Sequence, residues 1–241
     1  MKILITGAGG LLGHWAGLAA QGSHEVLAQW RRAPDEAQAV NIVATRVIAR
    51  YCGDTGRRLV FVSTDLVFDG RRGGYAEDDA VGPISRYAET KVLAEAEVRA
   101  ACPDHAIARS ALLYGSSLSG NRSSDEVILG SLRAGRPVRL FVDEYRTPVC
   151  APDLAQVLVG LAESDFRGTV HCGGSERISR FDLGVKFCCA AGVDPARLIR
   201  ASVADFQGVP PRAPDVSLDS GLLRRLLGRG LVGVDEGLKM K

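Results

Sequence analysis

Hydrophobic and polar positions follow two different periods along this chain of 241 residues. Short apolar runs bounded by glycine or polar residues are typical of buried strands, and longer stretches with apolar positions three and four apart are typical of helices. The short runs predict strands over residues 2–6, 24–29, 58–63, 106–113 and 169–172. The longer stretches predict helices over residues 11–21, 34–52, 85–100, 121–134, 152–163 and 180–191. This alternation predicts an α/β fold with a parallel sheet covered on both faces.

A glycine-rich turn, TGAGGLLG, follows the first apolar run, which we expect to be a buried strand. Its glycines are spaced G-x-x-G-x-x-G, so the stricter G-x-G-x-x-G pattern is not met. Glycines in such a turn let the backbone approach a pyrophosphate at the N-terminus of the following helix. A turn of this kind without a ligand is the alternative. The residues expected to contact a cofactor here are Gly7, Gly10, Leu11, Leu12 and Gly13.

Basic residues follow the second predicted strand, where dinucleotide-binding proteins often carry an acidic residue that binds the adenosine ribose. In this chain Gln29 and Trp30 are followed by Arg31 and Arg32. The two arginines are suited to a 2′-phosphate and would favour NADP. A solvated basic turn explains them equally well.

Two further segments carry side chains with acid–base chemistry. STDLVFDG begins at the end of the strand over 58–63, the edge at which open α/β sheets bind ligands. In YAETK, Tyr87 and Lys91 are four residues apart and share one face of a helix. A protonated Lys91 would lower the pKa of Tyr87 and make it a general acid, with Thr64 hydrogen-bonded to the same carbonyl oxygen. A surface helix produces this spacing by chance, but of the five tyrosines only Tyr87 has a basic residue four positions later.

Composition narrows the class of protein. Hydrophobic residues make up 46% and charged residues 24%, an ordinary globular balance. The net charge of +2 gives no electrostatic footprint for nucleic acid or a membrane surface. No run approaches the roughly 20 apolar residues of a membrane span. The six cysteines show no CxxC pair, so we expect core thiols in a reducing cytoplasm, with neither a disulfide framework nor a metal site.

Together these segments resemble the extended short-chain dehydrogenase/reductase family, and within it the dTDP-4-dehydrorhamnose reductase branch of sugar-nucleotide reductases. STDLVFDG and YAETK carry the resemblance, supported by VDEYRTPVCAPDLA, HCGGSERISRFDLG and PPRAPDVSLD further along the chain. The resemblance implies a Rossmann-like, doubly wound parallel sheet with a small C-terminal substrate-binding region. It implies that residues 1–115 and about 148–171 form the cofactor domain, and that residues 116–147 and 172–241 form the substrate region.

The resemblance also implies a reaction and its residues. NADP(H) or NAD(H) would reduce the C4 keto group of a nucleotide-linked 6-deoxy sugar, in the cytoplasm, and a homodimer is left open. The catalytic residues implied are Thr64, Tyr87 and Lys91. Further cofactor contacts are implied for Ser63, Tyr87, Lys91 and Tyr114, and substrate contacts for Asp65, Val67, Phe68 and Arg146. Core packing is the alternative for Tyr114, and a surface ion pair is the alternative for Arg146.

One departure from the family pattern concerns the stretch between Gln29 and Asn41. Judged against a complete βαβαβ half, about 40 residues are absent there, so the sheet would lack one or two strands. Asn41 matches the helix asparagine that ties neighbouring strands together in the family. A missing inner strand would leave edges unpaired and would threaten adenine binding most. The alternatives are therefore a non-catalytic NADP-binding regulatory subunit, such as a methionine adenosyltransferase regulatory-type protein, or a sugar-nucleotide epimerase or dehydratase.

Overall fold

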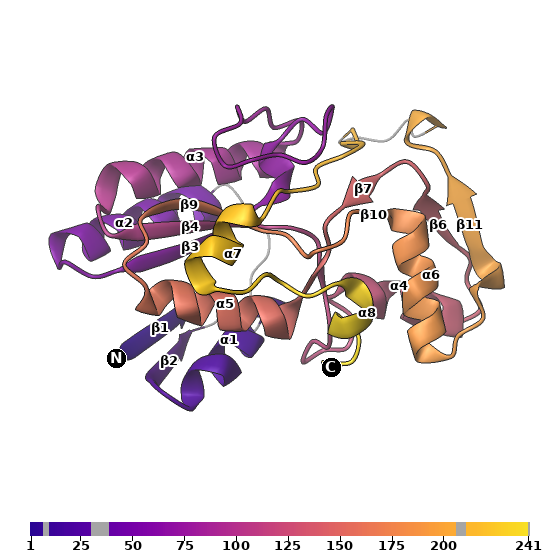
Figure 1. Cartoon of the computed structure of the whole chain (residues 1–241), viewed down its shortest axis with the longest axis horizontal. Coiled ribbons are helices and arrows are strands. Elements are labelled where there is room, and N and C mark those ends of the chain that lie inside the picture. Colours follow the sequence, from indigo (N-terminus) through magenta and orange to yellow (C-terminus); the bar gives the residue numbers. More distant parts are fainter. Residues whose placement is uncertain (7–9, 30–38, 206–210, 241) are drawn as a thin grey trace.

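The computed structural model describes residues 1–6, 10–29, 39–205 and 211–240, arranged as two lobes (Figure 1). The strands are β1 (Lys2–Thr6), β2 (Glu25–Gln29), β3 (Leu59–Thr64), β4 (His105–Ser110), β5 (Leu113–Tyr114), β6 (Val138–Phe141), β7 (Tyr145–Arg146), β8 (Val149–Cys150), β9 (Gly168–Cys172), β10 (Ile178–Ser179) and β11 (Leu198–Ala201). The helices are α1 (Leu11–Gln21), α2 (Thr45–Asp54), α3 (Arg86–Ala101), α4 (Ser124–Arg133), α5 (Ala151–Glu163), α6 (Arg180–Ala191), α7 (Gly221–Leu227) and α8 (Val234–Gly237). A π-helix, Ala39–Ala44, leads into α2. Within the described ranges, no helix is long and apolar enough to cross a bilayer.

Serine caps define where three of the helices begin. The hydroxyls of Ser85, Ser123 and Ser179 accept backbone N–H bonds at the starts of α3, α4 and α6. At α4 the Glu126 carboxylate completes a reciprocal capping box with Ser123. The expected helix over 180–191 is confirmed to the residue, and so is its serine cap.

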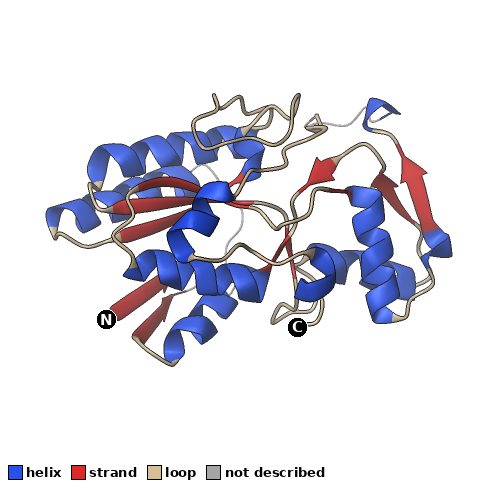
Figure 2. Cartoon of the chain, viewed as in Figure 1, coloured by secondary structure: helices blue, strands red, loops and turns tan. Residues whose placement is uncertain are grey.

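The parallel sheet is divided in two. Strands β3, β4 and β9 form one parallel sheet, and β1 and β2 form a separate parallel pair. Helices cover the larger sheet from opposite sides, with α3 on one and α5 on the other (Figure 2). The expected α/β fold with parallel strands is confirmed, and both parallel sheets are small. In the described part of the chain no ladder joins β1 to β3, which is where an inner strand would lie.

Strand β1 is much more exposed than a buried strand, so that expectation is wrong. Leu4 on β1 is 63% exposed and Leu27 on β2 is 54% exposed. Ile3 and Ile5 are half-buried. Side chains alternate between the two faces of a strand, so a pair covered on one face leaves every second residue in solvent. The unit formed by β1, β2 and α1 contacts the rest of the molecule mainly through α1, which packs against α5.

The core comprises several apolar clusters. The smaller lobe has its own cluster, built from α4, α6, β6 and β11 with the C-terminal α8. In the larger lobe one cluster lies under α5 and α7, and another lies between α2, α3 and the first residues of β3 and β4. All six cysteines are free thiols, and five of them are buried, while Cys189 is exposed.

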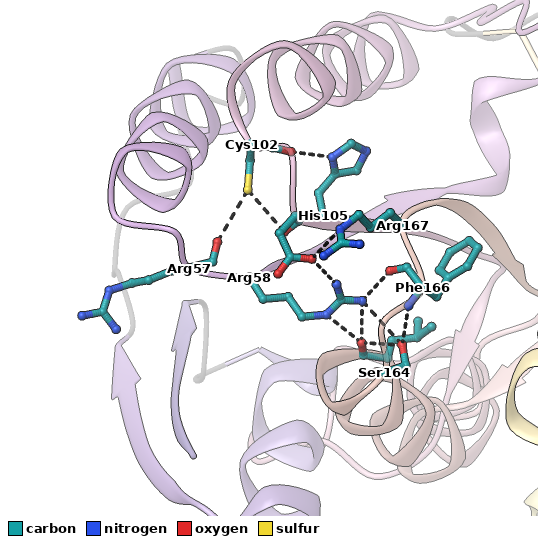
Figure 3. Close-up of polar contacts among 9 residues, drawn as sticks. Arg57, Arg58, Cys102, His105, Ser164, Phe166 and Arg167 are labelled. Carbon is teal, nitrogen blue, oxygen red and sulfur yellow. Dashed lines mark hydrogen bonds and ion pairs between the residues drawn. The ribbon is translucent and has the colours of Figure 1, made fainter.

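The Arg58 side chain cross-links segments at the amino-terminal ends of the strands in the larger sheet (Figure 3). Its Nη1 donates to Asp104 Oδ1 at 2.6 Å, in the turn between α3 and β4. Its Nε and Nη2 donate to the carbonyl of Leu161 near the end of α5, at 3.0 and 2.9 Å, and Nη2 also donates to the carbonyl of Phe166 at 2.6 Å. This arginine therefore ties β3 to two helix ends, at the opposite end of the strands from Thr64.

Candidate active site

The candidate site begins where β3 ends at Thr64. The Thr64 hydroxyl accepts the N–H of Leu66 at 3.2 Å, which caps a 3₁₀ turn over Asp65–Val67. The same hydroxyl donates to Asp65 Oδ1 at 3.1 Å. Its single proton is therefore engaged by Asp65. Donation to a substrate oxygen would require that bond to break.

Helix α3 brings Lys91 to the same strand. The Lys91 Nζ donates to the carbonyl of Val62 at 2.6 Å and lies 4.2 Å from the ring centroid of Phe61. Val62 is two residues from Thr64, so the ammonium lies beside the carboxyl end of β3. Burial lowers the pKa of Lys91 to about 8, and the Glu95 carboxylate opposes the shift. At neutral pH most of the molecules carry the charged form.

Tyr87 lies on the same face of α3, one turn earlier, and is 48% exposed. Desolvation of the phenol raises its pKa above the ordinary value, and the Asp65 carboxylate raises it further. The expected lowering of this pKa by Lys91 is therefore wrong for this conformation, because the ammonium is bound to the Val62 carbonyl. The phenol is protonated at neutral pH and can serve as a proton donor. Helix α3, which carries Tyr87, packs against the turn over Asp65–Val67 at the end of β3.

A buried ion cluster lies behind Thr64. Arg146 Nη1 bonds Asp65 Oδ2 at 3.1 Å, and Arg146 Nη2 bonds Glu144 Oε1 at 3.1 Å. The Arg146 side chain is 8% exposed, so the alternative of a surface ion pair is wrong, whereas the substrate contact expected of Arg146 stays a prediction. Both carboxylate oxygens of Asp65 are likewise hydrogen-bonded within the protein, and its expected role in the substrate pocket stays a prediction. The cluster joins the end of β3 to β7.

Three other expected contacts are core residues. Val67 and Phe68 have no exposed surface, because Tyr75 stacks on Phe68 at a centroid distance of 4.2 Å and residues 213–218 cover both. Tyr114 is also 0% exposed, its ring packed on Phe187 and its hydroxyl 3.5 Å from the Val234 carbonyl. The substrate contacts expected of Val67 and Phe68 and the nicotinamide contact expected of Tyr114 stay predictions. In this structure the side chains of all three residues pack in the core.

The expected cofactor turn is described only in part. Gly10 is the N-cap of α1 in an extended conformation, and no side chain of the described residues caps this helix. Leu11 is buried, and Leu12 packs on the cluster under α5, so these two residues can offer a ligand only their backbone. Ser63 is buried as well, so its side chain offers almost no surface to a cofactor. Gly7, Arg31 and Arg32 lie outside the described residues.

Glu144 and Arg180, which lie near the site, were not expected from the sequence. Glu144 and Arg146 are two positions apart, a spacing that puts both side chains on one face of an extended strand, and this signal could have found the pair. Nothing in the sequence distinguishes Arg180, which approaches the same cluster from α6, from a surface arginine. Asn41 donates from Nδ2 to Thr90 Oγ1 at 3.1 Å, so it ties the π-helix to α3 and not to a neighbouring strand.

A cavity in the described part of the chain lies away from these residues. It has a volume of about 270 Å³ at the carboxyl end of β9, between Thr147, Gly173 and Ser220. None of Thr64, Tyr87 and Lys91 lines it. Its Arg177 is already paired with Asp215 at 2.6 Å and lies 3.6 Å from the ring centroid of Tyr145. The candidate chemistry therefore does not belong to this cavity.

Comparison with known proteins identifies relatives over most of the chain. A family model described as the RmlD substrate binding domain matches residues 29–232. The dTDP-4-dehydrorhamnose reductase of Mycobacterium tuberculosis (strain ATCC 25618 / H37Rv) is 35% identical over 192 residues, which cover 76% of this chain and 62% of that protein. The chain thus spans less than two thirds of this relative's length.

Solved structures of two reductases share the fold. The crystal structure of a dTDP-4-dehydrorhamnose reductase from Clostridium acetobutylicum ATCC 824 has a TM-score of 0.89 at 25% identity, over 100% of this chain and 98% of that chain. The dTDP-4-dehydrorhamnose reductase from Bacillus anthracis str. Ames, in complex with NADP, also has a TM-score of 0.89, at 20% identity, over 99% of this chain and 97% of that chain. The Rossmann-like architecture expected from the sequence is thereby confirmed.

Proposed function

The chain belongs to the RmlD substrate binding domain family, and on that basis we propose that it is an NAD(P)H-dependent reductase of a nucleotide-linked 4-keto-6-deoxy sugar. The observation that carries the proposal is that helix α3, which bears Tyr87 and Lys91, packs on β3 and on the turn after Thr64, with Lys91 Nζ bonded to the Val62 carbonyl. Lys91 reaches that strand directly, and Tyr87 is within electrostatic range of the residue next to Thr64. An acid, a cation and a hydroxyl gathered at one sheet edge suit the reduction of a carbonyl group.

The described residues fit a nicotinamide cofactor at this edge. The first-turn amides of α1, after Gly10, have no side-chain cap among the described residues and suit a pyrophosphate. Lys91 Nζ and Tyr87 Oη would face the nicotinamide ribose from α3. When bound, NADP(H) or NAD(H) supplies the hydride for a carbonyl carbon. The Bacillus anthracis relative was solved with NADP, which supports NADP(H) as one of the two cofactors proposed.

The chain's own residues manage the proton. Tyr87 Oη holds the proton that neutralises the oxygen of the reduced carbonyl, and its raised pKa keeps that proton in place until it is needed. Release of Lys91 from the Val62 carbonyl would bring the ammonium toward the phenol and lower the Tyr87 pKa, which favours proton transfer. The Thr64 hydroxyl can then turn from Asp65 to the same oxygen.

We also propose the division of the chain implied by the resemblance, with residues 1–115 and about 148–171 around the cofactor and residues 116–147 and 172–241 around the sugar nucleotide. Supporting it, the smaller lobe has an apolar cluster of its own. A cytoplasmic location and a homodimer remain proposals of the same kind.

A regulatory, non-catalytic role is the second candidate, and two observations favour it. The division between β1 and β3 falls where a cofactor would cross the sheet, and Lys91 is occupied by a backbone carbonyl. Tyr87→Phe separates the candidates, because it would abolish reduction but would leave the binding of a partner protein intact.

The direct test is the consumption of NADPH by the full chain in the presence of dTDP-4-dehydrorhamnose. We expect turnover with the wild-type chain, a loss of at least about 100-fold in Tyr87→Phe because the proton donor is removed, and no loss in Tyr51→Phe, an exposed tyrosine on α2. Binding of NADPH without turnover by the wild-type chain would support the regulatory role. Equal turnover by wild type and Tyr87→Phe would exclude the proposed mechanism.

A further inference from the structure

The cavity at the carboxyl end of β9 is separate from the candidate reacting residues and has a volume of about 270 Å³. Its wall comes mainly from four segments that are far apart in the chain. They are the loop at Gly74, the residue Thr147, the turn over 173–175 after β9, and C-terminal residues between 217 and 231. Helix α7, in the last of these segments, packs against β9 (Figure 1). At about 30 Å³ for each water, the cavity exceeds the volume of several waters and has room for a small molecule.

Three hydroxyl groups line this cavity and keep their protons available. Each of them accepts a backbone N–H, at 3.3 Å for Thr147, 2.8 Å for Ser217 and 2.9 Å for Ser220. None of the three donates its own proton to an acceptor among the described residues. Thr147 is 5% exposed and Ser217 is 2% exposed, and a buried donor without an acceptor is unfavourable. The three hydroxyls therefore suit acceptor oxygens on a bound molecule.

A glycine keeps the space between two of these hydroxyls open. A Cβ at Gly173 would lie 2.5 Å from Thr147 Oγ1 and 3.2 Å from Ser220 Oγ. Both oxygens therefore lie close to one point of the wall, next to the Gly173 Cα. A side chain at this position would occupy the place from which a bound oxygen can reach both hydroxyls.

Arg224 brings a positive charge to the same cavity. It is an exposed residue of α7, and it has no ion pair with another described residue. The second lining arginine, Arg177, is neutralised by Asp215 at 2.6 Å. Asp219 is the acidic residue of the lining, but it is exposed to solvent, which screens its charge, and its Oδ1 accepts a backbone N–H at 2.7 Å. Arg224 is therefore the lining cation that a ligand can pair with.

We propose that this cavity binds a small oxyanionic molecule, whose phosphate or carboxylate group pairs with Arg224 and accepts protons from Thr147, Ser217 and Ser220. Hydroxyl and guanidinium donors form their stronger hydrogen bonds with charged oxygens, which favours an anion over a neutral molecule. A bound anion would join the C-terminal segment to the turn after β9, so it should stabilise the folded chain. The site lies apart from Tyr87 and does not depend on the proposed reductase activity.

Calorimetric titration of the full chain, at an ionic strength held constant with sodium chloride, tests the assignment. The probes are inorganic phosphate and malonate, one for each kind of oxyanion, and glucose as a neutral hydroxylated molecule. The variants are Arg224→Met, Ser220→Ala and, as the matched control, Arg225→Met, the next exposed arginine of α7, which does not line the cavity.

We expect the wild-type chain to bind phosphate or malonate at a single site. Arg224→Met should bind the same anion at least about 10-fold more weakly, the worth of a charge-assisted hydrogen bond. Ser220→Ala should also bind it more weakly, whereas Arg225→Met should match wild type. The inference would be overturned if wild type bound neither anion at tens of millimolar, if Arg224→Met bound as tightly as wild type, or if glucose bound more tightly than both anions.

Thermal unfolding of the same proteins gives a second readout. Phosphate and similar anions are excluded from protein surfaces and raise the Tm of any chain to some extent, and binding adds a further rise that depends on affinity. The total rise should therefore be smaller in Arg224→Met than in wild type and Arg225→Met. Without the anion the three Tm values should agree, because both arginines are exposed. An equal rise in all three would contradict a site at Arg224.

Discussion

Replacing Arg146 by methionine should destabilise the folded chain strongly, because two buried carboxylates then lose their positively charged partner. Arg146 bonds Asp65 and Glu144, each at 3.1 Å, and both acidic side chains are almost fully buried. Removing one partner of a buried ion pair typically costs about 3–5 kcal/mol. Two features favour the lower end of that range. Arg212 remains 3.8 Å from Glu144, and Asp65 keeps its hydrogen bond from Thr64. We therefore expect a loss of about 3 kcal/mol in the free energy of unfolding.

Urea unfolding of Arg146→Met against wild type measures this loss, with Arg139→Met as a control that removes an exposed arginine from the same lobe. Adding Glu144→Gln and Asp65→Asn to Arg146→Met should recover only part of it, since the two carboxylates are then neutral but Arg180 and Arg212 lose the Glu144 carboxylate. The deficit of the single variant should also shrink as the pH falls, because burial raises the pKa of Asp65 and its protonation removes a buried charge that has lost its partner. A loss below about 1 kcal/mol at neutral pH would refute the reasoning, because it would be the value of an exposed pair.

Three further predictions concern other parts of the fold. Urea unfolding should show that Arg58→Met lowers the free energy of unfolding by about 2–3 kcal/mol, because the variant loses the ion pair with Asp104 and the donors to the Leu161 and Phe166 carbonyls. The control Arg57→Met, at the neighbouring exposed arginine, should change the free energy of unfolding by less than about 0.5 kcal/mol. Burial opposes ionisation of Glu126, but hydrogen bonds from the Ser117 hydroxyl and three backbone N–H groups lower its pKa to about 2. The stability it provides is therefore present above its unfolded pKa and is lost as the pH falls toward about 2, so acid titration of Glu126→Gln should show a smaller loss than wild type over that window. Gly237→Ala should lower Tm, because a Cβ there would overlap the Tyr114 hydroxyl, while Gly17→Ala, where a Cβ meets nothing within 4 Å, should not.

The order and type of the elements could be predicted from the sequence because local signals define them. Ser179, followed by apolar residues at helical spacing, is sufficient to predict where α6 begins. The glycine-rich segment after Thr6 is sufficient to predict where β1 ends. The exposure of Leu4 could not be predicted, since an apolar run indicates burial only when neighbouring elements exist to cover it. The sheet division between β1 and β3 was foreseeable only from the family pattern, because nothing local records a strand that is absent.

For the site residues too, local spacing could be predicted from the sequence, whereas tertiary contacts could not. The helical spacing of Tyr87 and Lys91 was sufficient to bring them to one face, but it could not show that Lys91 bonds the Val62 carbonyl. The segment after Thr64 was expected to line a pocket, whereas Val67 and Phe68 turn inward under residues 213–218. The guanidinium of Arg146 forms ion pairs with Asp65 and Glu144, and the pairing with Asp65 depends on the tertiary fold, which the sequence pattern does not reveal.

Transfer of deuterium from C4-labelled NADPH to the sugar tests the central claim most directly. The full chain, at a concentration comparable to that of dTDP-4-dehydrorhamnose, is incubated with the labelled cofactor, and the product is analysed by mass spectrometry. We predict one deuterium in the sugar with wild type and none with Tyr87→Phe within the same time. An unlabelled sugar from wild-type chain that demonstrably binds NADPH would contradict the assignment of this chain as a reductase.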